Sequence, residues 1–199
     1  MAQRPNDIDP ESGFRLPLPK REDLDAEGQA VYDRIVNPKA NTIRGLRGPA
    51  GIRLYSPHNA LISDPINRYL RFESGLSAHA REVAILATAR EFDSQFEWAA
   101  HEPEALKEGV PASVIDVIKH RRTTAGLDEG DAVLIDLGRE MYGAKKVSSA
   151  TFARALAKFG PRQLVDVVCL MGNYAATAGL LAAFDMQLDP GQEPLLPIP

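Results

Sequence analysis

The chain has 199 residues, of which 44% are apolar and 25% are charged, as is typical of a globular protein with its own core. Its formal net charge of −4 argues against nucleic-acid binding, because nucleic-acid-binding domains usually carry a concentrated basic face. The single cysteine, Cys169, excludes an internal disulfide and a cysteine-rich metal site.

The two ends of the chain differ from its middle. Residues 1–20 are rich in Pro, Asp and Arg and lack periodicity, which predicts an extended N-terminal arm that is either mobile or draped over a neighbour. They contain no apolar run like that of a secretory signal, so a cytoplasmic protein is expected. Residues 188–199 hold four prolines and include the apolar run LLPIP. This composition predicts a non-helical tail that packs on another surface, such as a second subunit.

Between these ends the apolar residues recur with helical spacing. They predict an all-α domain over residues 21–187, a single bundle of seven or eight helices with no internal linker. Residues 42–57 are rich in Gly, Pro and Arg and predict a loop. No stretch reaches the roughly 18 uninterrupted apolar residues of a membrane span, so no membrane contact is expected. Pro65 is expected to break or kink its helix. The helices are expected at residues 21–36, 58–76, 78–92, 94–109, 111–122, 127–143, 148–160 and 161–184.

Three side chains of one predicted helix share a face. Ser94, Glu97 and His101 are separated by three and then four positions, which stacks them on one side of an α-helix. A carboxylate four residues before a histidine can accept its ring N–H and fix its tautomer, as in a general acid–base site. Two antiparallel helices joined by a short turn near Asp93 would bring Glu82 beside His101.

A structural interpretation of the same residues stays open. The phrase SQFE also fits a capping box, in which Ser94 caps the helix and Glu97 reaches back to the cap without any chemistry. A lone histidine is more often a hydrogen-bonded structural residue than a catalyst. Pro103 is expected to kink or end the helix just after His101, because it cannot donate a hydrogen bond to the carbonyl of Ala99.

A longer pattern surrounds these residues. Arg81 and Glu82 open the run REVAILATAREFDSQFEWAAHEPEALKEGVPASVIDVI, which contains the phrase FEWAAH and then Ala105 and Gly109 before Pro111. This run resembles the signature of the carboxymuconolactone decarboxylase and alkylhydroperoxidase D superfamily. The resemblance extends over most of residues 20–187 and includes the last helix, with Tyr174.

The resemblance implies an alkylhydroperoxidase D-like fold and a homo-oligomer (dimer, trimer or hexamer) with sites near subunit contacts. In the peroxidase branch, a Glu is followed by Cys-x-x-Cys and by a His four residues after the second cysteine. Glu82 and His101 match that pattern, whereas Ser94 and Glu97 occupy the two cysteine positions. Peroxide reduction by that route needs a thiolate and a resolving thiol, so disulfide-based peroxidase activity is excluded.

The decarboxylase branch implies acid–base chemistry without a cofactor or metal, on a small carboxylated lactone or keto acid of aromatic catabolism. In that chemistry His101 delivers a proton to the substrate carbon and Glu97 orients the His101 ring. Glu82 relays a proton or polarises a neighbouring group. Arginine forks bind carboxylates in a bidentate manner, although loop arginines are at least as often simply solvated. The substrate-binding candidates are Arg44, Arg47, Arg53, Ser94 and Tyr174.

Two other functions stay open. The chain could be a non-enzymatic ligand-binding or assembly member of the fold, or it could have a thiol-independent, peroxide-related activity.

Overall fold

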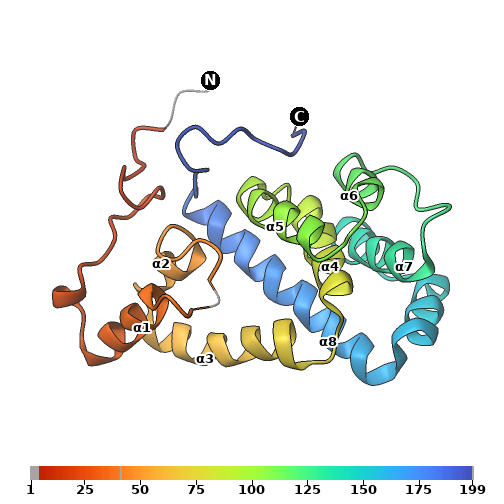
Figure 1. Cartoon of the computed structure of the whole chain (residues 1–199), viewed down its shortest axis with the longest axis horizontal. Helices are drawn as coiled ribbons and strands as arrows, with labels where there is room; N and C mark the ends of the chain where they lie inside the picture. Colours follow the sequence, from red (N-terminus) through yellow and green to blue (C-terminus); the bar gives the residue numbers. More distant parts are fainter. Residues whose placement is uncertain (1–4, 41, 199) are drawn as a thin grey trace. The chain divides into compact units, whose positions relative to one another are not determined.

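The computed structural model describes residues 5–40 and 42–198, and every regular element among them is helical (Figure 1). Those residues form eight α-helices, together with short 3-10 and π-helical segments, and no strand. The all-α prediction is confirmed. The first four residues of the predicted arm and the last residue of the tail lie outside the described residues.

The chain forms two compact units. Unit 1 runs up to Ile66 and also takes in Gly179–Gln192, and unit 2 comprises Asn67–Ala178 and the segment from Glu193. The division therefore falls inside two helices, α3 (Pro57–Arg68) and α8 (Ser149–Ala183), and the predicted domain boundaries after residues 20 and 187 stay a prediction.

Unit 1 contains α1 (Ala26–Val36), α2 (Pro49–Arg53) and most of α3. Asp25 begins α1, because its side chain accepts a hydrogen bond from the backbone N–H of Gly28 at 2.8 Å. The predicted loop over 42–57 contains the short helix α2, for which Pro49 supplies a pre-set φ at the first position. A small core joins these elements, formed by Val31, Ile35, Leu54 and Ala60.

The N-terminal arm is non-helical, and it is held within unit 1. Phe14 is fully buried, and the backbone N–H of Arg15 donates to the carbonyl of Phe184 at 3.0 Å. The N–H of Gln187 returns a bond to the carbonyl of Gly13 at 2.9 Å. The described part of the arm is therefore packed within unit 1.

Unit 2 is built around α4 (Ala78–Glu91). This helix begins at Ser77, whose side chain caps the N–H of Ala80, and it packs against α5, α6 and α7. All residues from Glu82 to Arg90 are buried. The sequence predicts one apolar stripe here, but α4 is surrounded by neighbours. The other elements are η2 (Tyr69–Glu73) and η3 (Arg139–Ala144), which are π-helical, and α5 (Gln95–Lys107), α6 (Ala112–Lys119), α7 (Glu129–Gly138) and α8.

A short turn joins α4 to α5. Asp93 has a φ of 48°, in the left-handed region, and the N–H of Ser94 donates to the carbonyl of Ala89 at 2.9 Å. The two helices lie side by side in Figure 1. The predicted helical hairpin is confirmed.

The prolines and one glycine affect the helices differently. Helix α5 continues through Pro103 to Lys107, and α3 continues through Pro65 to Arg68, so neither proline ends its helix. Gly160 does interrupt α8, because its φ of 69° and ψ of 169° are essentially restricted to glycine. The predicted boundary at Gly160 is confirmed.

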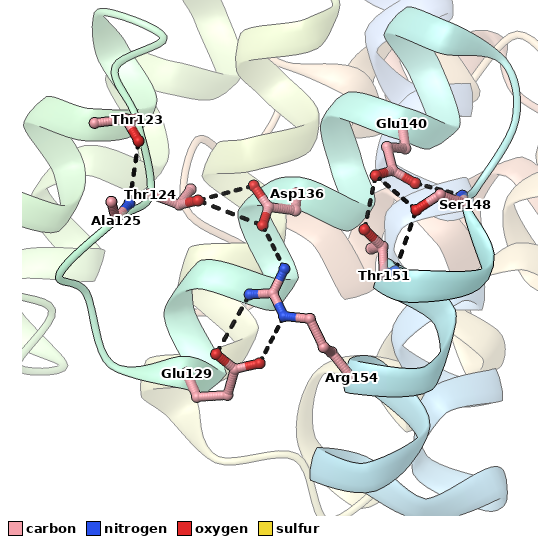
Figure 2. Close-up of polar contacts among 9 residues, drawn as sticks. All are labelled: Thr123, Thr124, Ala125, Glu129, Asp136, Glu140, Ser148, Thr151 and Arg154. Atoms are coloured by element: carbon pink, nitrogen blue, oxygen red, sulfur yellow. Dashed lines mark hydrogen bonds and ion pairs between the residues drawn. The ribbon is translucent and has the colours of Figure 1, made fainter.

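Figure 2 shows a polar network that ties the start of α8 to α7 and η3. Arg154 donates to Glu129 at 2.7 Å and to Asp136 at 2.8 Å. Glu140 accepts from the backbone N–H of Ser148 at 2.5 Å, directly before α8. The network fixes the first segment of α8 on the rest of unit 2.

The C-terminal tail packs on its own chain. Leu196 is buried in the core of unit 2, and the amide of Gln95 on α5 binds the tail backbone from both sides. Its nitrogen donates to the carbonyl of Leu196 at 2.6 Å, and its oxygen accepts from the N–H groups of Leu195 and Leu196 at 3.1 and 3.0 Å. The apolar end therefore packs on a surface of its own chain. The sequence predicts only that it packs on another surface, with a second subunit as one example.

Helix α8 is long and apolar enough to cross a membrane by length and composition. However, 44% of its most apolar window is buried, and core helices of soluble proteins pass the same test. The absence of a membrane span stays a prediction.

Candidate acid–base site

Glu82 and His101 meet in the interior of unit 2. The hairpin places Nδ1 of His101 on α5 2.8 Å from Oε2 of Glu82 on α4. Glu82 is 1% exposed and His101 is 5% exposed. The predicted contact between these two residues is confirmed, and it is shielded from water.

The neighbours of Glu82 fix its charge. Burial acts to raise the pKa of Glu82, but hydrogen bonds and positive charge from His101 and Arg81 outweigh it and lower the pKa. Nε of Arg81 donates to the second carboxylate oxygen at 2.9 Å. An ionised carboxylate can only accept, so Nδ1 of His101 carries the proton in this contact. Nε2 is then the ring nitrogen that can exchange a proton with a substrate.

The geometry identifies one carboxylate partner of the His101 ring, while the role expected for Glu97 stays a prediction. The carboxylate on Nδ1 comes from Glu82 on the preceding helix, because the antiparallel packing brings α4 against that edge of the ring. Glu97 is itself buried, with 4% exposure. Ser94 stands at the N-cap of α5, but its side chain makes no capping hydrogen bond. The capping-box interpretation is therefore wrong for Ser94.

Tyr174 of α8 completes the buried group. Its ring meets that of His101 edge to face, with centroids 5.1 Å apart and an interplanar angle of 83°. Burial raises the pKa of the Tyr174 hydroxyl, so the phenol is neutral over the physiological range. The charges of Arg71 and Arg81 oppose this rise, while those of Glu97 and Glu82 add to it. Four of the predicted site residues therefore lie close enough to interact through their rings or charges: Glu82, Glu97, His101 and Tyr174.

The loop arginines have a different partner. Nη1 of Arg44 lies 2.7 Å from Oδ2 of Asp189, and Nε of Arg47 lies 2.9 Å from Oδ1 of the same carboxylate. These contacts belong to unit 1, whereas His101 belongs to unit 2. Arg53, at the end of α2, is also a residue of unit 1. The three arginines therefore belong to unit 1 and His101 belongs to unit 2. Arg44 and Arg47 are paired with Asp189 of the C-terminal tail.

Two arginines near the buried pair were not predicted as site residues. Arg81 directly precedes Glu82, so its place in the sequence could have indicated it. Arg71 lies in the π-helical segment η2, and its guanidinium carbon stands 4.7 Å from the ring centroid of Phe72. The 3.6-residue period does not reveal a π-turn, so the sequence carried no comparable signal for Arg71.

Within residues 5–40 and 42–198, no group of three or more His, Cys, Asp or Glu side chains is arranged to hold a metal ion.

Compared with protein-family models, curated proteins and solved structures, the chain finds no match in any of the three.

Proposed function

We propose that the protein is a cytoplasmic, cofactor-free acid–base enzyme with an alkylhydroperoxidase D-like fold. It acts on a small carboxylated lactone or keto acid, by decarboxylation or a related lyase or isomerase step, as its resemblance to carboxymuconolactone decarboxylase implies. The observation that supports this proposal is the buried contact between Glu82 and His101. A carboxylate that holds one ring nitrogen leaves the other oriented for proton transfer.

In the decarboxylation, the bond between the substrate carbon and its carboxylate breaks, and CO2 leaves. The electron pair stays on the carbon as an enolate-like carbanion. His101 donates the proton on Nε2 to that carbon and is reprotonated from solvent. Glu82 holds Nδ1–H throughout and stabilises the imidazolium form that donates. The neutral Tyr174 packs on the ring and limits its rotation.

The test is CO2 release from a panel of carboxylated lactones and keto acids, with purified protein. We expect turnover by the wild type and a loss of about 100-fold or more in His101→Ala, the usual range for a general acid. The control is His120→Ala, because His120 also pairs with a carboxylate, Asp116, but lies at the surface with 41% of its side chain exposed. An unchanged rate in His101→Ala, or no CO2 from any substrate, would overturn the proposal.

An assembly role is the second candidate, and one face of α8 favours it. Val165, Val168, Cys169, Gly172 and Ala176 are all exposed, uncharged and spaced to share one side of the helix. A Cβ added to Gly172 would meet no atom within 4 Å, so another backbone can approach there closely. We propose that a second copy packs its own α8 face on this one, since each face offers the other an uncharged surface of small side chains.

Sedimentation tests this assembly. We expect an oligomer for the wild type and dissociation for Val168→Arg, which places a charge in the contact. Leu106→Arg is the control, because Leu106 is also exposed, at 51%, but lies on α5. Oxidation should link two copies through Cys169, the only cysteine of the chain. A monomeric wild type would contradict the assembly.

A further inference from the structure

Arg81 lies directly before Glu82 on α4, and its side chain contacts two other parts of unit 2. Nε donates to Oε1 of Glu82 at 2.9 Å, and Nη1 donates to the backbone carbonyl of Arg71 in η2 at 3.1 Å. Nη2 lies 3.9 Å from Oε1 of Glu108, the C-terminal cap of α5, in an ion pair. Only 11% of the Arg81 side chain is exposed. All three nitrogens of the guanidinium therefore have partners that fix its orientation.

The contact between Arg81 and Glu82 does not follow from helical spacing. Consecutive residues of an α-helix point about 100° apart, so their side chains do not face each other. The Arg81 side chain is held in its turned-back position by η2, which supplies the carbonyl of Arg71 and the ring of Phe72. The centroid of that ring stands 5.5 Å from the guanidinium carbon, within the range of a cation–π contact. The π-helical segment thus supports a contact that helical geometry alone would not make.

The two oxygens of Glu82 are thereby assigned to different donors. Oε1 accepts from Arg81, and Oε2 accepts from Nδ1 of His101 at 2.8 Å. Without a donor on Oε1, the carboxylate could rotate about its last bond and exchange its oxygens at the imidazole ring. Burial acts to raise the pKa of Glu82, and the hydrogen bonds and charges of His101 and Arg81 together lower it. Arg81 therefore helps to keep the carboxylate both ionised and in one orientation.

We propose that Arg81 is a positioning residue, which occupies Oε1 of Glu82 and so presents Oε2 to Nδ1 of His101. It acts through Glu82 and needs no contact with the substrate. The inference rests on the proposed function for the reaction, but the order that Arg81 imposes on the His101 ring is measurable without any substrate. The arginine fork matters, because a lysine amine is a point charge without a fixed planar set of donors.

Exchange of the proton on Nδ1 of His101 with water tests the inference. In full-length protein labelled with 15N at histidine, this proton should give the best-protected ring N–H signal. The His101 side chain is 6% exposed, whereas those of the other three histidines are at least 35% exposed. The signal is assigned by its loss in His101→Ala. Arg81→Gln should accelerate the exchange about tenfold or more, the effect of losing one hydrogen bond between charged groups.

Turnover provides a second measurement. For any substrate of the panel that releases CO2, Arg81→Gln should lower kcat about tenfold or more and leave KM within about twofold of the wild type. Arg154→Gln is the matched control, because Arg154 is also held in unit 2 by several hydrogen bonds, to Glu129 and Asp136 of α7. Its Nδ1 proton exchange and its kcat should stay within about twofold of the wild type.

Arg81→Lys keeps the positive charge and serves as a second variant if Arg81→Gln does not fold. Its exchange should also be faster than that of the wild type, by about threefold or more. Wild-type exchange in either variant of Arg81, or an equal acceleration in Arg154→Gln, would overturn the inference. A rise in KM at constant kcat would assign Arg81 to substrate binding and would also overturn it. Faster exchange in the Arg81 variants without CO2 release by any form would support the positioning role and refute the proposed reaction.

Discussion

Replacement of Glu82 by glutamine tests whether the buried carboxylate holds this part of unit 2 together. Glu82 accepts from Arg81 at 2.9 Å and from His101 at 2.8 Å, and only 1% of its side chain is exposed. Glutamine has the same shape but only one accepting atom, so one of the two donors faces an NH2 group. We expect a loss of about 2–4 kcal/mol, between the cost of one charge-assisted hydrogen bond and that of a broken buried ion pair.

Urea unfolding followed by the fluorescence of Trp98 measures this loss. Trp98 is the only tryptophan, is fully buried, and lies on the same helix as His101. With a typical slope of about 2 kcal/mol per molar urea, the midpoint should fall by on the order of 1 M while the slope stays unchanged.

The matched control is Asp116→Asn. Asp116 also has one arginine and one histidine beside it: it accepts from Arg122 at 2.5 Å and lies 3.5 Å from His120 in an ion pair, but 39% of its side chain is exposed. Its replacement should cost about 0–1 kcal/mol, because exposed ion pairs contribute little. The reasoning is refuted if Asp116→Asn costs as much as Glu82→Gln, or if Glu82→Gln costs nothing measurable.

Three further predictions concern pH, a buried hydroxyl and the tail. The pKa of Glu82 is lowered in the folded state, so its contribution to stability is complete above the ordinary pKa of 4.5 and is lost as the pH falls below that value. Urea midpoints measured at decreasing pH should therefore fall less steeply for Glu82→Gln than for the wild type. Oη of Tyr142 is buried without a hydrogen-bond partner among the described residues, so Tyr142→Phe should leave stability unchanged or raise it by about 1 kcal/mol. Burial raises the pKa of Tyr142 to about 12, so the same variant should lose less stability than wild type between pH 10 and 12 in thermal melts. Gln95→Ala removes three hydrogen bonds to the backbone of Leu195 and Leu196. Hydrogen exchange at these two amides should therefore accelerate by about tenfold or more. Unchanged exchange would contradict the observed packing of the tail.

Local patterns of the sequence were sufficient for the helical class and for the contact at the centre of the candidate site. The apolar spacing predicts helices on both sides of Asp93, and a turn of a few residues forces them to pack antiparallel. Glu82 and His101 then face each other, because each lies two to three helical turns from the joint. The break at Gly160 was equally readable, since a glycine before a proline is a local signal.

The partners of the charged side chains could not be predicted in this way. Arg44 binds Asp189, which is 145 residues away, and Leu196 binds Gln95, which is 101 residues away. Such pairs are set by the path of the chain, and no periodicity along the sequence specifies it. For the same reason the sequence did not indicate that Arg44 and Arg47 both pair with Asp189.

The sequence by itself determined that the chain is helical and that a glutamate and a histidine share a hairpin. Only the tertiary structure decided that Glu82 holds Nδ1 of His101, and that the Tyr174 ring meets the His101 ring edge to face. The physical reason is that helical periodicity fixes which residues share a face, whereas the packing of a neighbouring helix fixes which atoms that face meets and how much water remains between them.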